Sequence, residues 1–140
     1  MSAQHDEIVQ WIIKGDHDLG TAKITFLHIP EYMDTVTFHC QQAVEKYLKS
    51  YLVFLSISFK FTHDLVYLLD LICQKDDEFK NQYNTLAELQ SYSVEVRYPN
   101  ETIFLTKEKV ESSLITAKEV RDLIILKMGI SVEYHEVISK

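Results

Sequence analysis

The clearest pattern in the sequence is CQQAVEKYLKSYLVFL, residues 40–55. Its apolar side chains recur at steps of three and four residues, which places them on one broad face of a helix. A cap on Asp34 or Thr35 is expected to begin this helix. The apolar positions are Cys40, Ala43, Val44, Tyr47, Leu48, Tyr51, Leu52 and Leu55.

Three further long helices are predicted from the same kind of periodicity. Ile29 precedes Pro30 and is pushed out of helical geometry, so the first of them ends there, and Trp11 within it is expected in the core. Thr106 is placed to cap the last helix, which Gly129 ends. The three helices are expected over residues 5–28, residues 77–96 and from the Thr106 cap to Met128.

A short helix is predicted between the second and third long helices. Thr62 is placed to cap it over about residues 63–74, with Phe61 and Val66 as a hydrophobic staple. Its inward face would consist of Leu65, Leu68, Leu69 and Ile72.

Composition agrees with an all-α fold. The chain has 140 residues with 46% hydrophobic and 25% charged, which fits one folded domain. Three Gly and two Pro are too few for the turns of a many-stranded β fold. We expect one helical domain over residues 1–129 and a flexible tail over residues 130–140, where Ile130, Val132 and Tyr134 leave a short strand as the alternative.

The net charge of −7, from 14 Lys plus Arg and 21 Asp plus Glu, argues against binding of long nucleic acid through the whole surface. The sequence contains neither a secretory leader pattern nor a spanning segment, so a cytoplasmic protein is expected without a membrane partner. Cys40 and Cys73 are expected to be buried free thiols. No metal or cofactor is predicted, since Asp16, His17 and Asp18 point in different directions on a helix.

Four polar residues form a stripe beside the apolar face of residues 40–55: Gln42, Glu45, Lys46 and Lys49. One interpretation is a solvated face with a Glu45–Lys49 ion pair. The other is a ligand or partner surface whose two ammonium groups bind an anion.

Three other polar residues need a role. A carboxylate at Asp64 suits a helix N-terminus, whereas the neighbouring His63 could hydrogen-bond another helix or act as a general base. Arg97, which is followed by Tyr98, could bind helix carbonyls, pair with Glu45 or Asp64, or recognise phosphate.

An ordered set of motifs resembles the HEPN (higher eukaryotes and prokaryotes nucleotide-binding) family: QQAVEKYLKS at residues 41–50, THDL at residues 62–65 and RYPN at residues 97–100. Asp18 and Leu19 with Trp11 and Ala22 are similar to the family's first helix. The resemblance implies an up-and-down four-helix bundle with an additional short helix, which forms a homodimer. It also implies a link with a minimal nucleotidyltransferase in a two-component system, or with nucleotide binding.

Many members of that family are metal-independent ribonucleases with an Arg followed by a His after four to six intervening residues. No His stands at that spacing after Arg97 or Arg121. The sequence therefore favours a non-catalytic module that binds a nucleotide (ATP or GTP) or a nucleotidyltransferase. Its expected binding residues are Gln42, Glu45, Lys46, Lys49, His63, Asp64, Arg97 and Tyr98. One alternative is a ribonuclease toxin that uses His63 and Arg97. Another is that the three motifs only stabilise the bundle and its dimer interface through an ion-pair network, without a small ligand.

Overall fold

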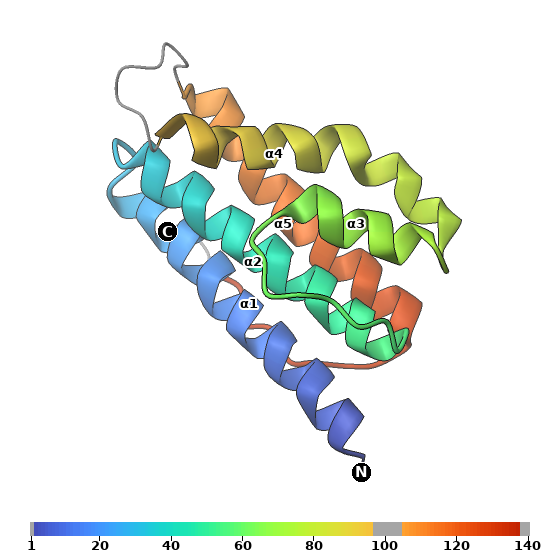
Figure 1. Cartoon of the computed structure of the whole chain (residues 1–140). Helices are drawn as coiled ribbons and strands as arrows, with labels where there is room; N and C mark the ends of the chain where they lie inside the picture. Colours follow the sequence, from blue (N-terminus) through green and yellow to red (C-terminus); the bar gives the residue numbers. More distant parts are fainter. Residues whose placement is uncertain (1, 97–104, 138–140) are drawn as a thin grey trace.

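The computed structural model describes residues 2–96 and 105–137, in which all regular structure is helical. The long helices α1, α2, α4 and α5 run alternately in opposite directions, and the shorter α3 lies beside α2 and α4 (Figure 1). This arrangement confirms the predicted all-α up-and-down bundle with an additional short helix. The elements are α1 (Ala3–His28), α2 (Met33–Phe54), α3 (Leu65–Cys73), the 3₁₀ helix η1 (Asp77–Gln82), α4 (Tyr83–Val96) and α5 (Lys107–Met128).

Helix α2 lies at the centre of the bundle and packs against α1, α3, α4 and α5. Its predicted apolar face is buried, except that Leu55 after the helix end is half-buried. A helix surrounded by four others must bury more than one stripe, and this is why polar side chains of α2 are also inside. The buried polar residues of α2 are Thr37, Gln41, Glu45, Lys49 and Ser50.

The starts of α2 and α3 differ from the prediction. Helix α2 begins at Met33, before both expected caps, and its N-cap residue Tyr32 makes no side-chain cap bond. Helix α3 begins at Leu65, because the Asp64 carboxylate accepts hydrogen bonds from the backbone N–H groups of Val66 and Tyr67, at 3.0 and 3.1 Å. A carboxylate is a strong N-cap, and the partial positive charge at the helix N-terminus stabilises it further.

The predicted cap on Thr62 and the staple on Phe61 are therefore wrong. The Thr62 hydroxyl accepts from the backbone N–H of Asp64, outside the helix, at 3.0 Å. Phe61 is 87% exposed and does not pack as a staple residue would.

The predicted ends of α5 are confirmed. The Thr106 hydroxyl accepts from the backbone N–H of Lys109 at 3.2 Å, and Gly129 ends the helix in the left-handed region with φ of 64°. The helix predicted over residues 77–96 is instead divided into η1 and α4. The buried ring of Phe79, stacked on Tyr51 at 5.1 Å between centroids, anchors η1 against α2.

Helices α1 and α2 approach closely at Gly15. A Cβ atom added there would lie 2.6 Å from Cε1 of Tyr47, whose ring is fully buried. The same addition at Gly20 would meet nothing within 4 Å. Glycine is thus required at one of these two helical positions and not at the other.

We expect Gly15→Ala to lower the free energy of unfolding by about 1–3 kcal/mol, because the buried Tyr47 ring must move to make room. The matched variant Gly20→Ala is expected to raise it by about 0.5–1 kcal/mol, since alanine loses less conformational freedom on folding. Urea denaturation of both variants measures the difference. Equal effects at the two positions would contradict the close approach.

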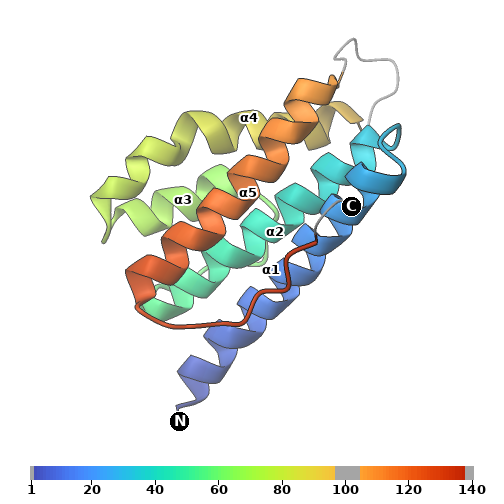
Figure 2. The same ribbon diagram turned by 180° about the vertical axis from the view of Figure 1, so that it is seen from behind.

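The segment after α5 runs back along α1 (Figure 2). Alternate residues Ile130, Val132 and Tyr134 are half-buried and pack against the core, although no strand forms in the described part of the segment. The flexibility expected for residues 130–140 stays a prediction.

Cys40 is fully buried, and burial raises the pKa of its thiol to about 12. The free thiol of Cys73 is only half-buried, so the prediction of a buried residue is wrong there. None of the described helices is long and apolar enough to cross a bilayer.

Candidate functional site

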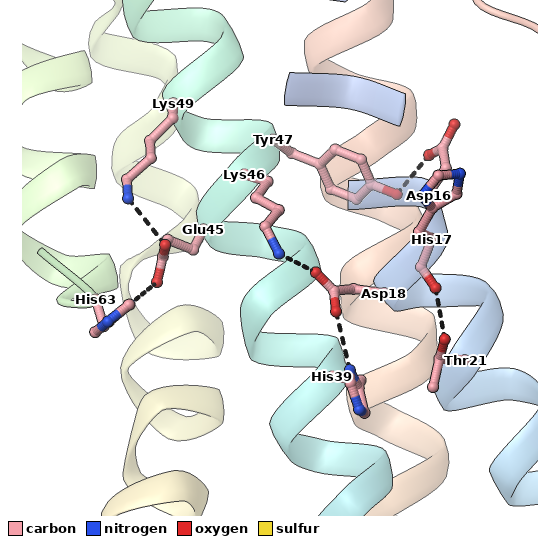
Figure 3. A network of polar contacts seen from close by, with 10 residues as sticks. All are labelled: Asp16, His17, Asp18, Thr21, His39, Glu45, Lys46, Tyr47, Lys49 and His63. Carbon is pink, nitrogen blue, oxygen red and sulfur yellow. Dashed lines mark hydrogen bonds and ion pairs between the residues drawn. The ribbon is translucent and has the colours of Figure 1, made fainter. Parts of the chain in front are cut away.

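The polar side chains of α2 point toward two different neighbours (Figure 3). Glu45 and Lys49 face the loop that leads into α3, whereas Lys46 reaches toward Asp18 on α1. The structure therefore does not bring the two lysines together on one surface. Gln42 is half-buried on the same helix.

Glu45 and Lys49 form a buried ion pair. The Lys49 Nζ lies 2.9 Å from Glu45 Oε2, and each side chain is only 4% exposed. The predicted pairing is confirmed, but the interpretation of a solvated face is wrong for these two residues. Lys49 lies among aromatic rings from α1 and from the α2–α3 loop instead of in solvent.

Three aromatic rings surround the Lys49 ammonium. The distances from Nζ to the ring centroids are 5.3 Å for Trp11, 5.6 Å for Phe61 and 5.9 Å for Phe59. Ring faces carry negative potential, so they compensate part of the hydration that Lys49 loses on burial. Trp11 is half-buried at this position and is not the core residue that was expected.

The buried pair holds a histidine at the surface. His63 Nδ1 lies 2.7 Å from Glu45 Oε1, and the His63 side chain is 52% exposed. The ring of Phe61 meets the imidazole edge to face, with 5.4 Å between centroids. Lys49, Glu45 and His63 thus form a chain of contacts from the interior to solvent, which we call the Lys–Glu–His chain.

A second group of charges lies between α1 and α2. Asp18 binds Lys46 through one carboxylate oxygen and His39 Nδ1 through the other, the latter at 2.9 Å. The predicted role for Lys46 in an anion site with Lys49 would require Lys46 to leave Asp18. Asp64, also expected in that site, instead caps α3.

A third group ties α1 to α5 and to the C-terminal segment. Arg121 donates to Asp16 through Nε at 2.7 Å and through Nη2 at 3.0 Å, and Nη2 also donates to the carbonyl of Val132 at 3.1 Å. The Tyr47 hydroxyl donates to Asp16 at 2.7 Å, and burial followed by the charge of Asp16 raises the pKa of Tyr47. Burial lowers the pKa of Arg121, but the hydrogen bonds and charge of Asp16 outweigh that effect and raise it above its ordinary value.

A comparison with protein families matches residues 8–128 to the model of the HEPN domain. The chain belongs to the HEPN domain family. Comparisons with curated proteins and with solved structures found no match.

Sequence reasoning missed several polar contacts of this HEPN domain. The sequence pattern links Arg121 only to the ribonuclease signature, although an arginine between the apolar residues Val120 and Ile124 indicates a buried charge that needs a partner. It links Asp16 only to metal binding, and Asp18 to metal binding and to the family resemblance. The described residues contain no group of three or more His, Cys, Asp or Glu side chains placed to hold a metal ion.

Arg97 and Tyr98 of the HEPN domain lie outside the described residues. Their expected binding roles stay predictions, as does binding by Gln42, Glu45, Lys46, Lys49, His63 and Asp64. Of these, the described structure joins Glu45, Lys49 and His63 directly.

Proposed function

We propose that this HEPN domain is a non-catalytic module that binds a nucleotide or a minimal nucleotidyltransferase, as one half of a two-component, toxin–antitoxin-like system. In this proposal the module acts as a homodimer. The observation that carries the proposal is the Lys–Glu–His chain, in which a buried ion pair holds a half-exposed imidazole next to an exposed aromatic ring.

The burial of Glu45 and Lys49 supports a role beyond folding. Removing two charges from water costs several kcal/mol per ion, and apolar residues of similar volume often stabilise a fold as well or better. A charged pair at this place also fixes the orientation of His63, which an apolar pair would not do. A ligand or a partner protein would therefore meet a pre-oriented imidazole.

The lysines are less suited to contact a ligand than their sequence positions indicated. Lys49 is buried, and Lys46 is paired with Asp18. We therefore assign the first ligand contact to His63, while Arg97 remains a candidate phosphate ligand from its motif alone. The absence of the family's ribonuclease spacing in the sequence supports a module without catalysis.

Titration calorimetry with ATP and GTP tests the proposal. His63→Ala is expected to weaken nucleotide binding by about two- to tenfold, as for the loss of one hydrogen bond. The matched control is His39→Ala, because His39 also binds a carboxylate of low exposure through Nδ1 but lies on the α1 side. Equal affinities of wild type and His63→Ala would remove His63 from the site.

Binding to a nucleotidyltransferase is tested by mixing this HEPN protein with a purified minimal nucleotidyltransferase. A stable complex that His63→Ala weakens and His39→Ala leaves unchanged would support docking at the Lys–Glu–His chain. If the wild-type protein bound no nucleotide and no nucleotidyltransferase, the proposed function would be wrong.

One observation favours a second candidate, the metal-independent ribonuclease. A carboxylate that holds Nδ1 of a half-exposed histidine, as Glu45 holds His63, is an arrangement suited to general acid–base catalysis. In this case RNA would be cleaved in the presence of EDTA, and His63→Ala and Glu45→Gln would lose the cleavage while His39→Ala kept it. Intact RNA with the wild-type protein would exclude this candidate.

A further inference from the structure

We propose that Phe61 is a stacking platform for a purine base and that His63 binds the ribose of the same ligand. The site would then recognise a nucleoside through its base and sugar, with phosphate as a minor contributor. This inference rests on the nucleotide-binding arm of the proposed function and names the ligand's contact points.

Phe61 is exposed, and two side chains contact its ring. At 87% it is the most exposed of the large apolar side chains in the described residues. Its ring nevertheless has the Lys49 ammonium on one face at 5.6 Å and the His63 ring against it at 5.4 Å and 75°. Other exposed phenylalanines, Phe38 and Phe54, are only 48% and 40% exposed. A large apolar ring exposed to solvent offers a surface on which a flat ligand can stack.

The electrostatics of the ring favour a base. A cation under one face of an aromatic ring draws π-electron density toward itself, so the outer face is less negative than in a free ring. An electron-rich purine stacks well on such a face, whereas a second cation does not. Stacking of a base on an aromatic side chain is worth about 1–3 kcal/mol and suits any base with an accessible face.

The imidazole offers the matching polar contact. His63 Nδ1 faces the Glu45 carboxylate, which can only accept a hydrogen bond, so Nδ1 carries the hydrogen and Nε2 of the neutral imidazole form is an acceptor. This nitrogen accepts a hydrogen bond from a ribose hydroxyl when the base lies on Phe61. A phosphate group would gain less binding energy at this site, because Lys49 is already paired with Glu45 and the chain has a net charge of −7.

The test compares adenosine, ATP and inorganic tripolyphosphate by calorimetry, with fluorescence of the single tryptophan, Trp11, as a second readout close to the site. Phe61→Leu keeps an apolar side chain and removes the ring, so it is expected to weaken adenosine and ATP about tenfold or more. Phe61→Trp is expected to bind at least as tightly as wild type. A short oligoadenylate shows whether the preferred base comes from a free nucleoside or from a strand.

Phe38→Leu is the matched control. Phe38 is exposed and meets the edge of a histidine, His39, with 5.3 Å between centroids and 80° between rings. Among the ring contacts of the described residues, Phe38 has no lysine over its ring as Phe61 has. We therefore expect Phe38→Leu to leave the affinities for adenosine and ATP unchanged. Thermal unfolding of all three variants checks that they remain folded.

The outcomes separate the two proposals. If ATP binds equally to wild type and Phe61→Leu, or if tripolyphosphate binds as tightly as ATP, the stacking inference is wrong and nucleotide binding remains. If Phe61→Leu weakens binding of the nucleotidyltransferase but not of adenosine or ATP, Phe61 is a protein contact and the inference is also wrong. If neither adenosine nor ATP binds the wild type, both the inference and the nucleotide arm fail.

Discussion

Replacing Lys49 by Met is expected to lower the free energy of unfolding by about 3–5 kcal/mol, which is the usual cost of leaving one charge of a buried pair without its partner. Glu45, whose side chain is 4% exposed, would lose its lysine partner and keep its contact with His63. The ammonium at the centre of the Trp11, Phe59 and Phe61 rings would be lost at the same time. The loop between α2 and α3 would thereby lose a major contact.

Urea denaturation at neutral pH measures this loss. The double variant Lys49→Met, Glu45→Met is expected to recover most of it, because removing both charges also removes the uncompensated burial. The control is Lys80→Met, which breaks the exposed pair with Asp77 and is expected to leave stability unchanged within error. If Lys49→Met and Lys80→Met behaved alike, the buried pair would have no special energetic role.

Replacing Arg121 by Leu is also expected to lower the free energy of unfolding by about 3–5 kcal/mol. Asp16 would remain at low exposure and lose two charged hydrogen bonds, while it kept the Tyr47 hydroxyl as a partner. The carbonyl of Val132 would lose its hydrogen-bond donor. The ring of Tyr134 would lose its contact with the guanidinium, which lies 4.5 Å from the ring centre. Arg121 therefore contributes both to the α1–α5 contact and to the attachment of the C-terminal segment.

Two measurements distinguish these effects. Urea denaturation gives the loss of stability, and the rate of chymotrypsin cleavage at Tyr134 reports release of the C-terminal segment. Lys118→Leu is the control, because Lys118 also contacts the Tyr134 ring, at 5.2 Å, but its ion pair with Asp122 is exposed. We expect that variant to change stability by less than about 1 kcal/mol. Unchanged cleavage in Arg121→Leu would show that the segment is held by other contacts.

The helices could be predicted because their signals are local. The repeat of apolar residues from Cys40 to Leu52 predicted the buried face of α2, and Thr106 with Gly129 predicted both ends of α5. Predictions were wrong where two local signals competed. Thr62 and Asp64 are both good caps, and the carboxylate is the one that caps α3.

The candidate site could be predicted only in part. His63 and the Glu45–Lys49 pair were found from the motifs, but the burial of the pair and its cover of aromatic rings were not. Asp18 and Arg121 were not recognised as partners of residues far along the chain, since Arg121 lies 105 positions from Asp16. No pattern within one helix carries that information.

The sequence by itself determined that the chain is a bundle of helices and which face of each is apolar, because helix period and capping depend on neighbours within a few residues. Only the tertiary structure decided which charges are buried and with whom. Lys46 and Lys49 are about 60° apart around α2, given 3.6 residues per turn. That angle is enough for one to reach Asp18 on α1 and the other to be enclosed by the α2–α3 loop. Which neighbour occupies each direction is a property of the packed bundle.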